Sequence, residues 1–261
     1  MPTVRKSAVA GTFYPDDPNS LQSMITQFLE NTTQLPHHFR VIIAPHAGYI
    51  YSGQTAAHAY KQLETVKKNI KRVVLLGPAH RVPFLGLASS SADYFETPLG
   101  NIPLDRDAIQ VLNQLPHINI NDQAHTQEHS LEVHLPFLQT ILTDFNLIPL
   151  VVGDSDKESI SDVIELFWHD PSTFVVISSD LSHFHEYYQA QSIDQNTANA
   201  IMNLKPEDIS YEQACGRIPI SGLLDFAQHH HLKATLLDLK NSGDTAGTRD
   251  NVVGYGAFGF E

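Results

Sequence analysis

The sequence predicts an α/β protein built as three layers, α/β/α, around a central mixed sheet. Short apolar, β-branched runs alternate along the chain with segments of helical period, and this alternation is typical of layered α/β proteins. The runs are hydrophobic at nearly every position, which indicates strands covered by helices on both faces. The 261 residues are 42% hydrophobic, enough for one sizeable core, so we expect a single domain over residues 1–261.

The strands are predicted from the apolar runs, and one segment breaks their pattern. The runs cover residues 40–44, 72–76, 147–152, 173–177, 234–239 and 252–260. Residues 85–99 alternate more weakly and precede Gly100, so we interpret them as an antiparallel hairpin. That hairpin favours a mixed sheet over a fully parallel one.

The helices are predicted from apolar residues that recur with a period near 3.6. They cover residues 20–31, 53–64, 105–115, 130–142, 157–168, 187–203 and 211–230. No Pro/Gly/Ser-rich linker and no internal repeat divides the chain, which agrees with a single domain.

Charge and cysteine content exclude several classes of function. The chain carries 16 Lys and Arg against 29 Asp and Glu, and its net charge of −13 repels nucleic acids and anionic lipids. The single cysteine, Cys215, cannot form an internal disulfide, and no apolar run approaches the ~20 residues that cross a bilayer. We therefore expect a cytoplasmic protein without nucleic-acid or membrane partners. No phosphate-binding Gly-rich loop with Lys occurs, so we expect no nucleotide cofactor.

Histidines follow the predicted strands at the point where each strand ends. Of the 15 histidines, His46 and His80 come just after two of the apolar runs, and Asp180 and His183 follow a third. Ligands of open α/β sheets bind beyond the carboxyl ends of the strands. We therefore expect these four side chains to line one pocket.

The segment Glu128-His129-Ser130-Leu131-Glu132-Val133-His134 carries a second group of titratable residues. Its two histidines are five positions apart and do not share a helix face, which excludes the zinc-protease motif with histidines four apart. We interpret His129 as an acid/base group at a loop-to-helix junction. A solvated helix start remains the alternative for Glu128, Glu132 and His134.

Cys215 admits three interpretations that its sequence context does not separate. It is a small buried side chain, a thiolate ligand for iron, copper or zinc, or a nucleophile activated by a histidine. His229, His230 and His231 end a predicted helix, and we interpret them as a solvated terminus.

Several blocks of sequence, spread in order over the whole chain, resemble the Memo-like family, called AmmeMemoRadiSam system protein B in prokaryotes. They are Ala10-Gly11-Thr12-Phe13-Tyr14-Pro15, Ala44-Pro45-His46-Ala47-Gly48-Tyr49 with Tyr51-Ser52-Gly53, Leu76-Gly77-Pro78-Ala79-His80, Glu128 to Pro136, Ser178-Ser179-Asp180-Leu181-Ser182-His183, Cys215-Gly216-Arg217 and Val253-Gly254-Tyr255.

The resemblance implies a fold like that of class III extradiol dioxygenases, whose non-haem ferrous site uses two histidines and a carboxylate. His46 and His80 would be the imidazole ligands, and Cys215 would stand in place of the carboxylate. The cofactor would be iron(II) or copper, with zinc as a further candidate, because a thiolate favours softer metals. We assign His129, Asp180 and His183 to catalysis. Substrate-binding roles are assigned to three further residues: Tyr49, Glu128 and His134.

The resulting hypothesis is a metal-dependent oxidoreductase that acts on an unidentified small molecule. One alternative is a non-catalytic module that binds a phosphorylated or anionic peptide, as implied by an animal member of the family. Another is a redox-active protein that handles copper or iron. The family name also implies a pathway link to a radical S-adenosylmethionine protein and an AMMECR-type protein.

Overall fold

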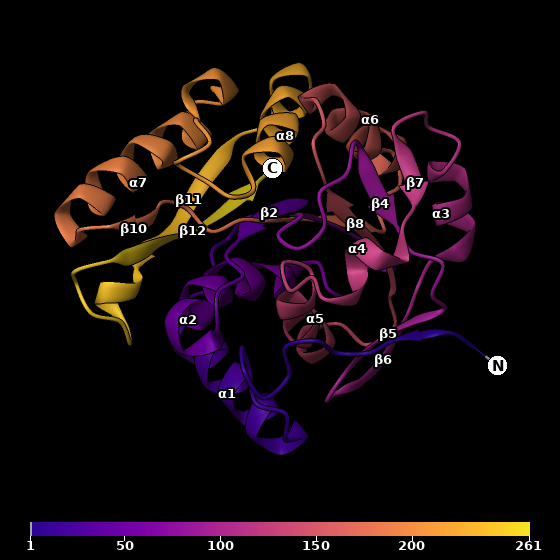
Figure 1. Cartoon of the computed structure of the whole chain (residues 1–261), viewed down its shortest axis with the longest axis horizontal. Coiled ribbons are helices and arrows are strands. Elements are labelled where there is room, and N and C mark those ends of the chain that lie inside the picture. The colour runs from indigo at the N-terminus through magenta and orange to yellow at the C-terminus, as the bar shows by residue number, and fades with distance from the viewer. Residues whose placement is uncertain (1) are drawn as a thin grey trace.

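A computed structural model describes residues 2–261 and confirms the mixed central sheet (Figure 1). Within these residues the sheet has nine strands in the order β10-β12-β2-β9-β3-β8-β4-β7, with β11 paired to β12. The strands are β2 (Val41–Ala44), β3 (Arg72–Pro78), β4 (Leu87–Ser89), β7 (Ile118–Ile120), β8 (Asn146–Val152), β9 (Thr173–Ser178), β10 (His183–His185), β11 (Ala234–Asn241) and β12 (Val252–Phe260). β2, β9, β3 and β8 are parallel, whereas β12 and β4 run antiparallel beside them.

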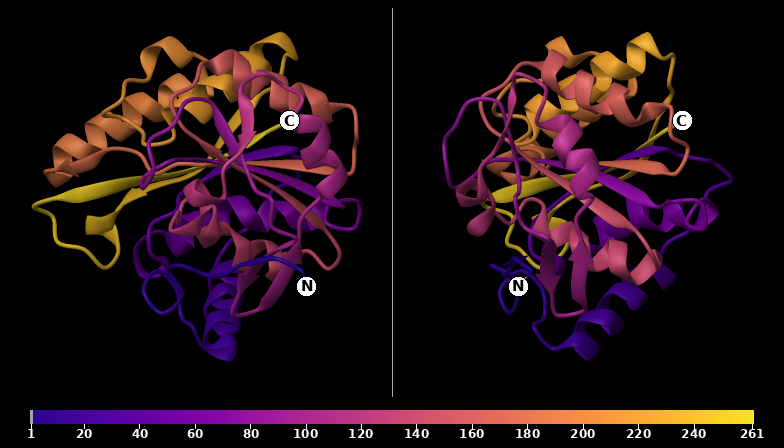
Figure 2. Two further views of the ribbon diagram at one scale, coloured as in Figure 1. Left: turned by 45° about the vertical axis from the view of Figure 1, so that its right-hand side comes forward. Right: turned by 90° about the vertical axis from the view of Figure 1, so that its right-hand side faces the viewer.

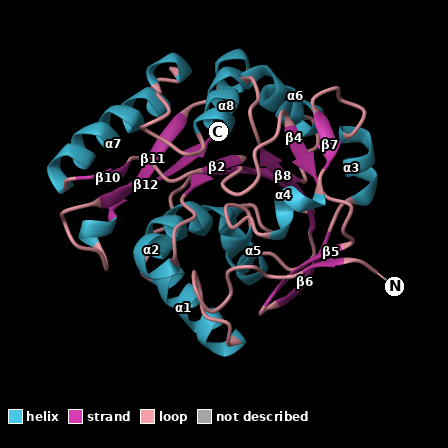
Figure 3. Ribbon diagram, viewed as in Figure 1, coloured by secondary structure: helices cyan, strands magenta, loops and turns pink. Residues whose placement is uncertain are grey.

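Helices cover both faces of this sheet, so the predicted three layers are confirmed (Figure 2, Figure 3). One face is covered by α6 (Lys157–Trp168), α7 (Tyr187–Met202) and α8 (Arg217–His229). The other carries α2 (Tyr49–Tyr60) and α5 (Leu135–Ile141), and α1 (Pro18–Glu30) packs outside these two. The short helices α3 (Arg106–Leu112) and α4 (Asp122–Thr126) lie toward the β4–β7 end of the sheet.

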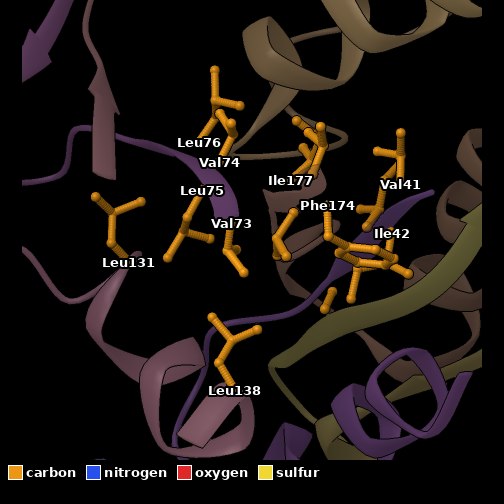
Figure 4. Packing of buried hydrophobic residues seen from close by; sticks show 14 of the residues in the cluster. Val41, Ile42, Val73, Val74, Leu75, Leu76, Leu131, Leu138, Phe174 and Ile177 are labelled. Carbon is orange, nitrogen blue, oxygen red and sulfur yellow. The ribbon is translucent and has the colours of Figure 1, made fainter. Parts of the chain in front are cut away.

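The core lies between the layers, around the four parallel strands. Every residue of β2 and β9 is buried, and Figure 4 shows Val41, Ile42 and Phe174 packed near Val73 and Leu75 of β3. Burying one such side chain contributes roughly 1.5–3 kcal/mol. The core therefore holds the carboxyl ends of β2, β9 and β3 in a defined relative position. None of the helices within residues 2–261 combines the length and apolar character needed to cross a bilayer.

The predicted hairpin over residues 85–99 is wrong in its position. β4 belongs to the central sheet, and the hairpin is formed by β5 (Tyr94–Thr97) and β6 (Gly100–Pro103), which join β1 (Val4–Arg5) in a small second sheet. Gly100 has a φ of 117° and begins the second strand. Glycine adopts such a positive φ without strain, so Gly100 lies at the turn between the two strands. The hairpin therefore continues past Gly100, whereas the sequence predicted that it ends before this residue.

Three predicted helices start elsewhere than expected. The helix predicted from residue 211 begins at Arg217, and residues 211–216 form turns that carry Cys215. The helix predicted over residues 130–142 divides into a 3-10 turn, Glu132–His134, followed by α5, in which Pro136 occupies the first turn. The helix predicted from residue 53 already begins at Tyr49.

Candidate metal centre

Three adjacent strands bring the predicted site residues to one edge of the sheet. β2, β9 and β3 are parallel neighbours, and Ala44 pairs in register with Ser178. The residues that follow these strands therefore leave the same edge, as the sequence predicted. The ring centroids of His46 and His80 are 5.1 Å apart.

His46 is held through one ring nitrogen, and its other ring nitrogen faces Cys215. Its Nδ1 lies 2.6 Å from the hydroxyl of Ser178, and that hydroxyl donates its proton to the carbonyl of Ser130 at 2.6 Å. The hydroxyl must then accept from His46, so Nδ1 carries the ring proton. Burial, together with His80 and other nearby histidines, holds the pKa of His46 well below its usual value. The imidazole is therefore neutral, and its unprotonated Nε2 is available as a metal ligand.

His80 is oriented by Glu128. Glu128 accepts from the Nδ1 of His80 at 2.9 Å and from its backbone N–H at 2.6 Å. Burial opposes ionisation of Glu128, but the hydrogen bonds from His80 and Ser130 outweigh it and lower its pKa to about 2. An ionised carboxylate only accepts hydrogen bonds, so His80 donates from Nδ1, and its Nε2 takes no part in this contact. Carboxylates play this part beside the histidine ligands of metal sites.

Cys215 completes a group of three potential ligands. Its Sγ lies 3.5 Å from the Nε2 of His46, and one ligand atom each of His46, His80 and Cys215 lie within 4.8 Å of one another. The sulfur also accepts from the backbone N–H of Asp180 at 3.3 Å. Burial and the charge of Asp180 raise the pKa of the thiol to about 12. The side chain is thus a thiol at neutral pH, and a metal would have to displace its proton.

Two of the predicted catalytic residues border this group. Asp180 accepts from the backbone N–H of His46 at 2.8 Å, and burial raises its pKa to about 7. His129 stacks on His80 with ring centroids 4.7 Å apart, and its buried Nδ1 lies 3.3 Å from the Oε1 of Glu128 without forming a hydrogen bond. Burial and the neighbouring His80 lower the pKa of His129 to about 4, so its ring is neutral and can accept a proton.

His183 lies at the start of β10, where the pairing with β12 is irregular between His183 and His185. Burial lowers its pKa, and His80 adds to this effect. The intervening Phe184 is exposed and has a φ of 62°, an unusual conformation for a bulky residue.

Tyr49 and His134, predicted to bind substrate, are buried in the core, and the Nε2 of His134 has no hydrogen-bond partner there. The Tyr49 hydroxyl donates to the carbonyl of Val133 at 2.8 Å. The Nδ1 of His134 is hydrogen-bonded to the hydroxyl of Tyr60 at 2.8 Å. A contact between these two residues and a substrate stays a prediction.

Glu132 is the residue whose surroundings the sequence analysis missed. Glu128, Glu132 and His134 are all buried, so the alternative of a solvated helix start is wrong. Glu132 pairs with the buried Arg5 and accepts from Tyr14 at 2.5 Å and from two backbone N–H groups near residue 8. Arg5 also donates to the carbonyl of Glu128 at 2.7 Å. The N-terminal segment thus braces the loop that orients His80. In the sequence, only the motif around Tyr14 indicated a role for this N-terminal segment.

Comparisons with known proteins agree over nearly the whole chain. The model of a family described as "Memo-like protein" matches residues 5–258. The chain is 35% identical to a "MEMO1 family protein" of Aquifex aeolicus, with 97% of each chain covered. It is 30% identical to "Protein memo-1 homolog" of Caenorhabditis elegans, over 87% of this chain and 72% of that protein. A solved structure, "uncharacterized protein JW3007 from Escherichia coli K12", covers 84% of this chain with a TM-score of 0.55 and 11% identity, which supports the fold alone.

Proposed function

Because this chain belongs to the Memo-like protein family, we propose that it is a metal-dependent oxidoreductase in which His46, His80 and Cys215 hold iron(II) or copper. The observation that carries the proposal is the convergence of their ligand atoms to within 4.8 Å. The substrate is an unidentified small molecule that enters at the carboxyl edge of the sheet.

The donor set fits such a metal. Imidazole and thiolate are ligands that iron, copper and zinc share, and the thiolate favours copper(I) or zinc more than a carboxylate would. Both histidines have their second nitrogen engaged, by Ser178 and Glu128, in the manner usual for metal-bound imidazoles. When bound, the metal supplies a Lewis acid and, for iron or copper, a redox couple.

The residues around the donors supply acid/base chemistry. His129 is neutral, so its imidazole can take a proton from a substrate hydroxyl, and its Nδ1 lies 3.3 Å from the Oε1 of Glu128. Asp180, whose pKa is about 7, lies with Oδ2 4.0 Å from His46 Nε2 and can hold or release a proton near neutral pH. We assign His183 to a second proton-transfer position because it follows Asp180 on the same edge.

The test is the metal content of protein purified without oxygen and without an affinity tag, measured by mass spectrometry. We expect near-stoichiometric iron or copper in the wild type, and loss of this metal in Cys215→Ser and in the double variant His46→Ala/His80→Ala. His58→Ala is the matched control, because His58 is a half-buried histidine on α2 outside the three-residue group. Circular dichroism checks that each variant is folded. Stoichiometric metal in the double variant would contradict the proposed ligands.

Oxygen consumption with catechols tests the redox activity separately. We expect turnover by the metal-loaded wild type and none by Cys215→Ser. Metal binding without turnover of any reducing substrate would favour metal handling over catalysis. The anionic-peptide alternative has less support, because His46 and His129 are neutral and Glu128 is ionised. Calorimetry with phosphotyrosine tests it directly, and saturable binding would revive it.

A further inference from the structure

A group of carboxylate and imidazole side chains lies at the opposite edge of the sheet, where α6 and α8 end. It consists of Glu165 on α6, His169 just after α6, and His230 just after α8. Arg40, which immediately precedes β2, lies over the ring of Trp168 in the same region. His46 follows the other end of β2, so the length of that strand separates this group from the candidate metal centre.

One carboxylate contacts both imidazoles of this group. Glu165 Oε2 lies 2.6 Å from His230 Nε2, and Glu165 Oε1 lies 3.5 Å from His169 Nε2. Glu165 and His169 are four residues apart at the end of α6, so their side chains share one face. The neighbouring helix supplies the third side chain.

Close packing of α6 and α8 places His230 beside Glu165. A Cβ on Gly222 of α8 would lie only 2.3 Å from the Cβ of Ile160, so a glycine is needed for the observed approach. The His230 ring stacks on Phe226 with centroids 4.1 Å apart, and these contacts leave 27% of its side chain exposed. The ring is therefore held in place with Nε2 directed at the carboxylate.

We propose that Glu165, His169 and His230 form a second site, one that binds an exchangeable divalent ion of the zinc, nickel or copper(II) class. Two imidazoles and one carboxylate are a ligand set that such ions accept, with water in the remaining positions. The side chain of His169 is 85% exposed and is free to turn its Nε2 toward the ion. The site does not depend on the proposed function of the other centre.

The chain contains its own reporter for this site. Trp168 is the single tryptophan, and its ring centroid lies 6.0 Å from that of His230. A paramagnetic ion such as Ni²⁺ bound to His230 quenches the fluorescence of a ring this close. The experiment is a titration of tag-free protein with NiCl2, followed by displacement with ZnCl2.

We expect saturable quenching at one equivalent of Ni²⁺, reversed by Zn²⁺. Glu165→Gln and His169→Asn should each weaken the apparent affinity at least tenfold, and His169→Asn changes only an exposed side chain. The matched control is His231→Asn, a neighbouring exposed histidine whose φ of 56° asparagine tolerates. This control should titrate like the wild type.

Two results would overturn the proposal. The first is quenching that does not saturate, or that is the same in Glu165→Gln and His169→Asn as in the wild type. The second is loss of the quenching in Cys215→Ser, since the signal would then report the other centre. If the quenching persists in Cys215→Ser, the second site stands whether or not His46, His80 and Cys215 bind metal.

Discussion

Replacing Glu128 by glutamine should weaken the candidate metal centre without removing any of its three ligands. The carboxylate accepts from His80 twice, at Nδ1 and at the backbone, and from the backbone N–H groups of His129 and Ser130. Both oxygens of the carboxylate accept from N–H groups, and glutamine retains only one such oxygen. Its amide NH2 group takes the place of the other oxygen and there faces an N–H group, so that two donors meet. At least one buried donor then loses its partner, which costs about 1–3 kcal/mol of folding free energy.

The same change releases the His80 ring from its fixed tautomer and orientation. Loss of such a partner typically lowers metal affinity about 10- to 100-fold. We would measure the affinity by competition with a chelator and the unfolding free energy of the metal-free protein in urea. Glu158→Gln is the control, since that carboxylate is largely exposed at the start of α6. Wild-type metal affinity in a folded Glu128→Gln variant would refute the reasoning.

Three further predictions concern the surroundings of the centre. Arg5→Met should destabilise the protein by about 3–5 kcal/mol in urea unfolding, because it leaves the Glu132 carboxylate buried without its cation. The double variant Arg5→Met/Glu132→Gln should recover part of this loss. Additive effects of the two substitutions would argue against an energetic coupling between Arg5 and Glu132. Burial raises the pKa of the Cys215 thiol to about 12. In the folded, metal-free protein this thiol should therefore react with iodoacetamide at pH 7.5 far more slowly than in the unfolded protein. Equal rates in the two states would contradict a buried thiol. Burial raises the pKa of Asp194 to about 6, so the folded chain keeps a proton that the unfolded chain loses above pH ~4. The unfolding free energy of the wild type should therefore fall relative to that of Asp194→Asn by about 2–3 kcal/mol as the pH rises from 4 to above 6. Parallel pH profiles of the two proteins would contradict this prediction.

The position of the site was predictable because it depends on a general property of parallel sheets. Apolar runs identified β2, β3 and β9, and the side chains after their carboxyl ends had to share an edge. The roles of individual side chains were not predictable in this way. Ser178, which sets the tautomer of His46, and Arg5, which braces the loop of Glu128, act through contacts between segments more than 100 residues apart.

Local pattern and tertiary packing therefore determined different features of this protein. The alternation of apolar runs with helical segments by itself determined the α/β class and the edge at which the histidines gather, whereas the tertiary structure decided that β4 and β12 run antiparallel in the central sheet. Only the tertiary structure placed the sulfur of Cys215 3.5 Å from His46, because the turn before α8 folds back onto the loop after β9. The same holds for Glu165 and His230, whose contact depends on the close packing of α6 and α8. Periodicity reports which face of an element is buried, whereas the partner of a side chain is decided by which elements pack together.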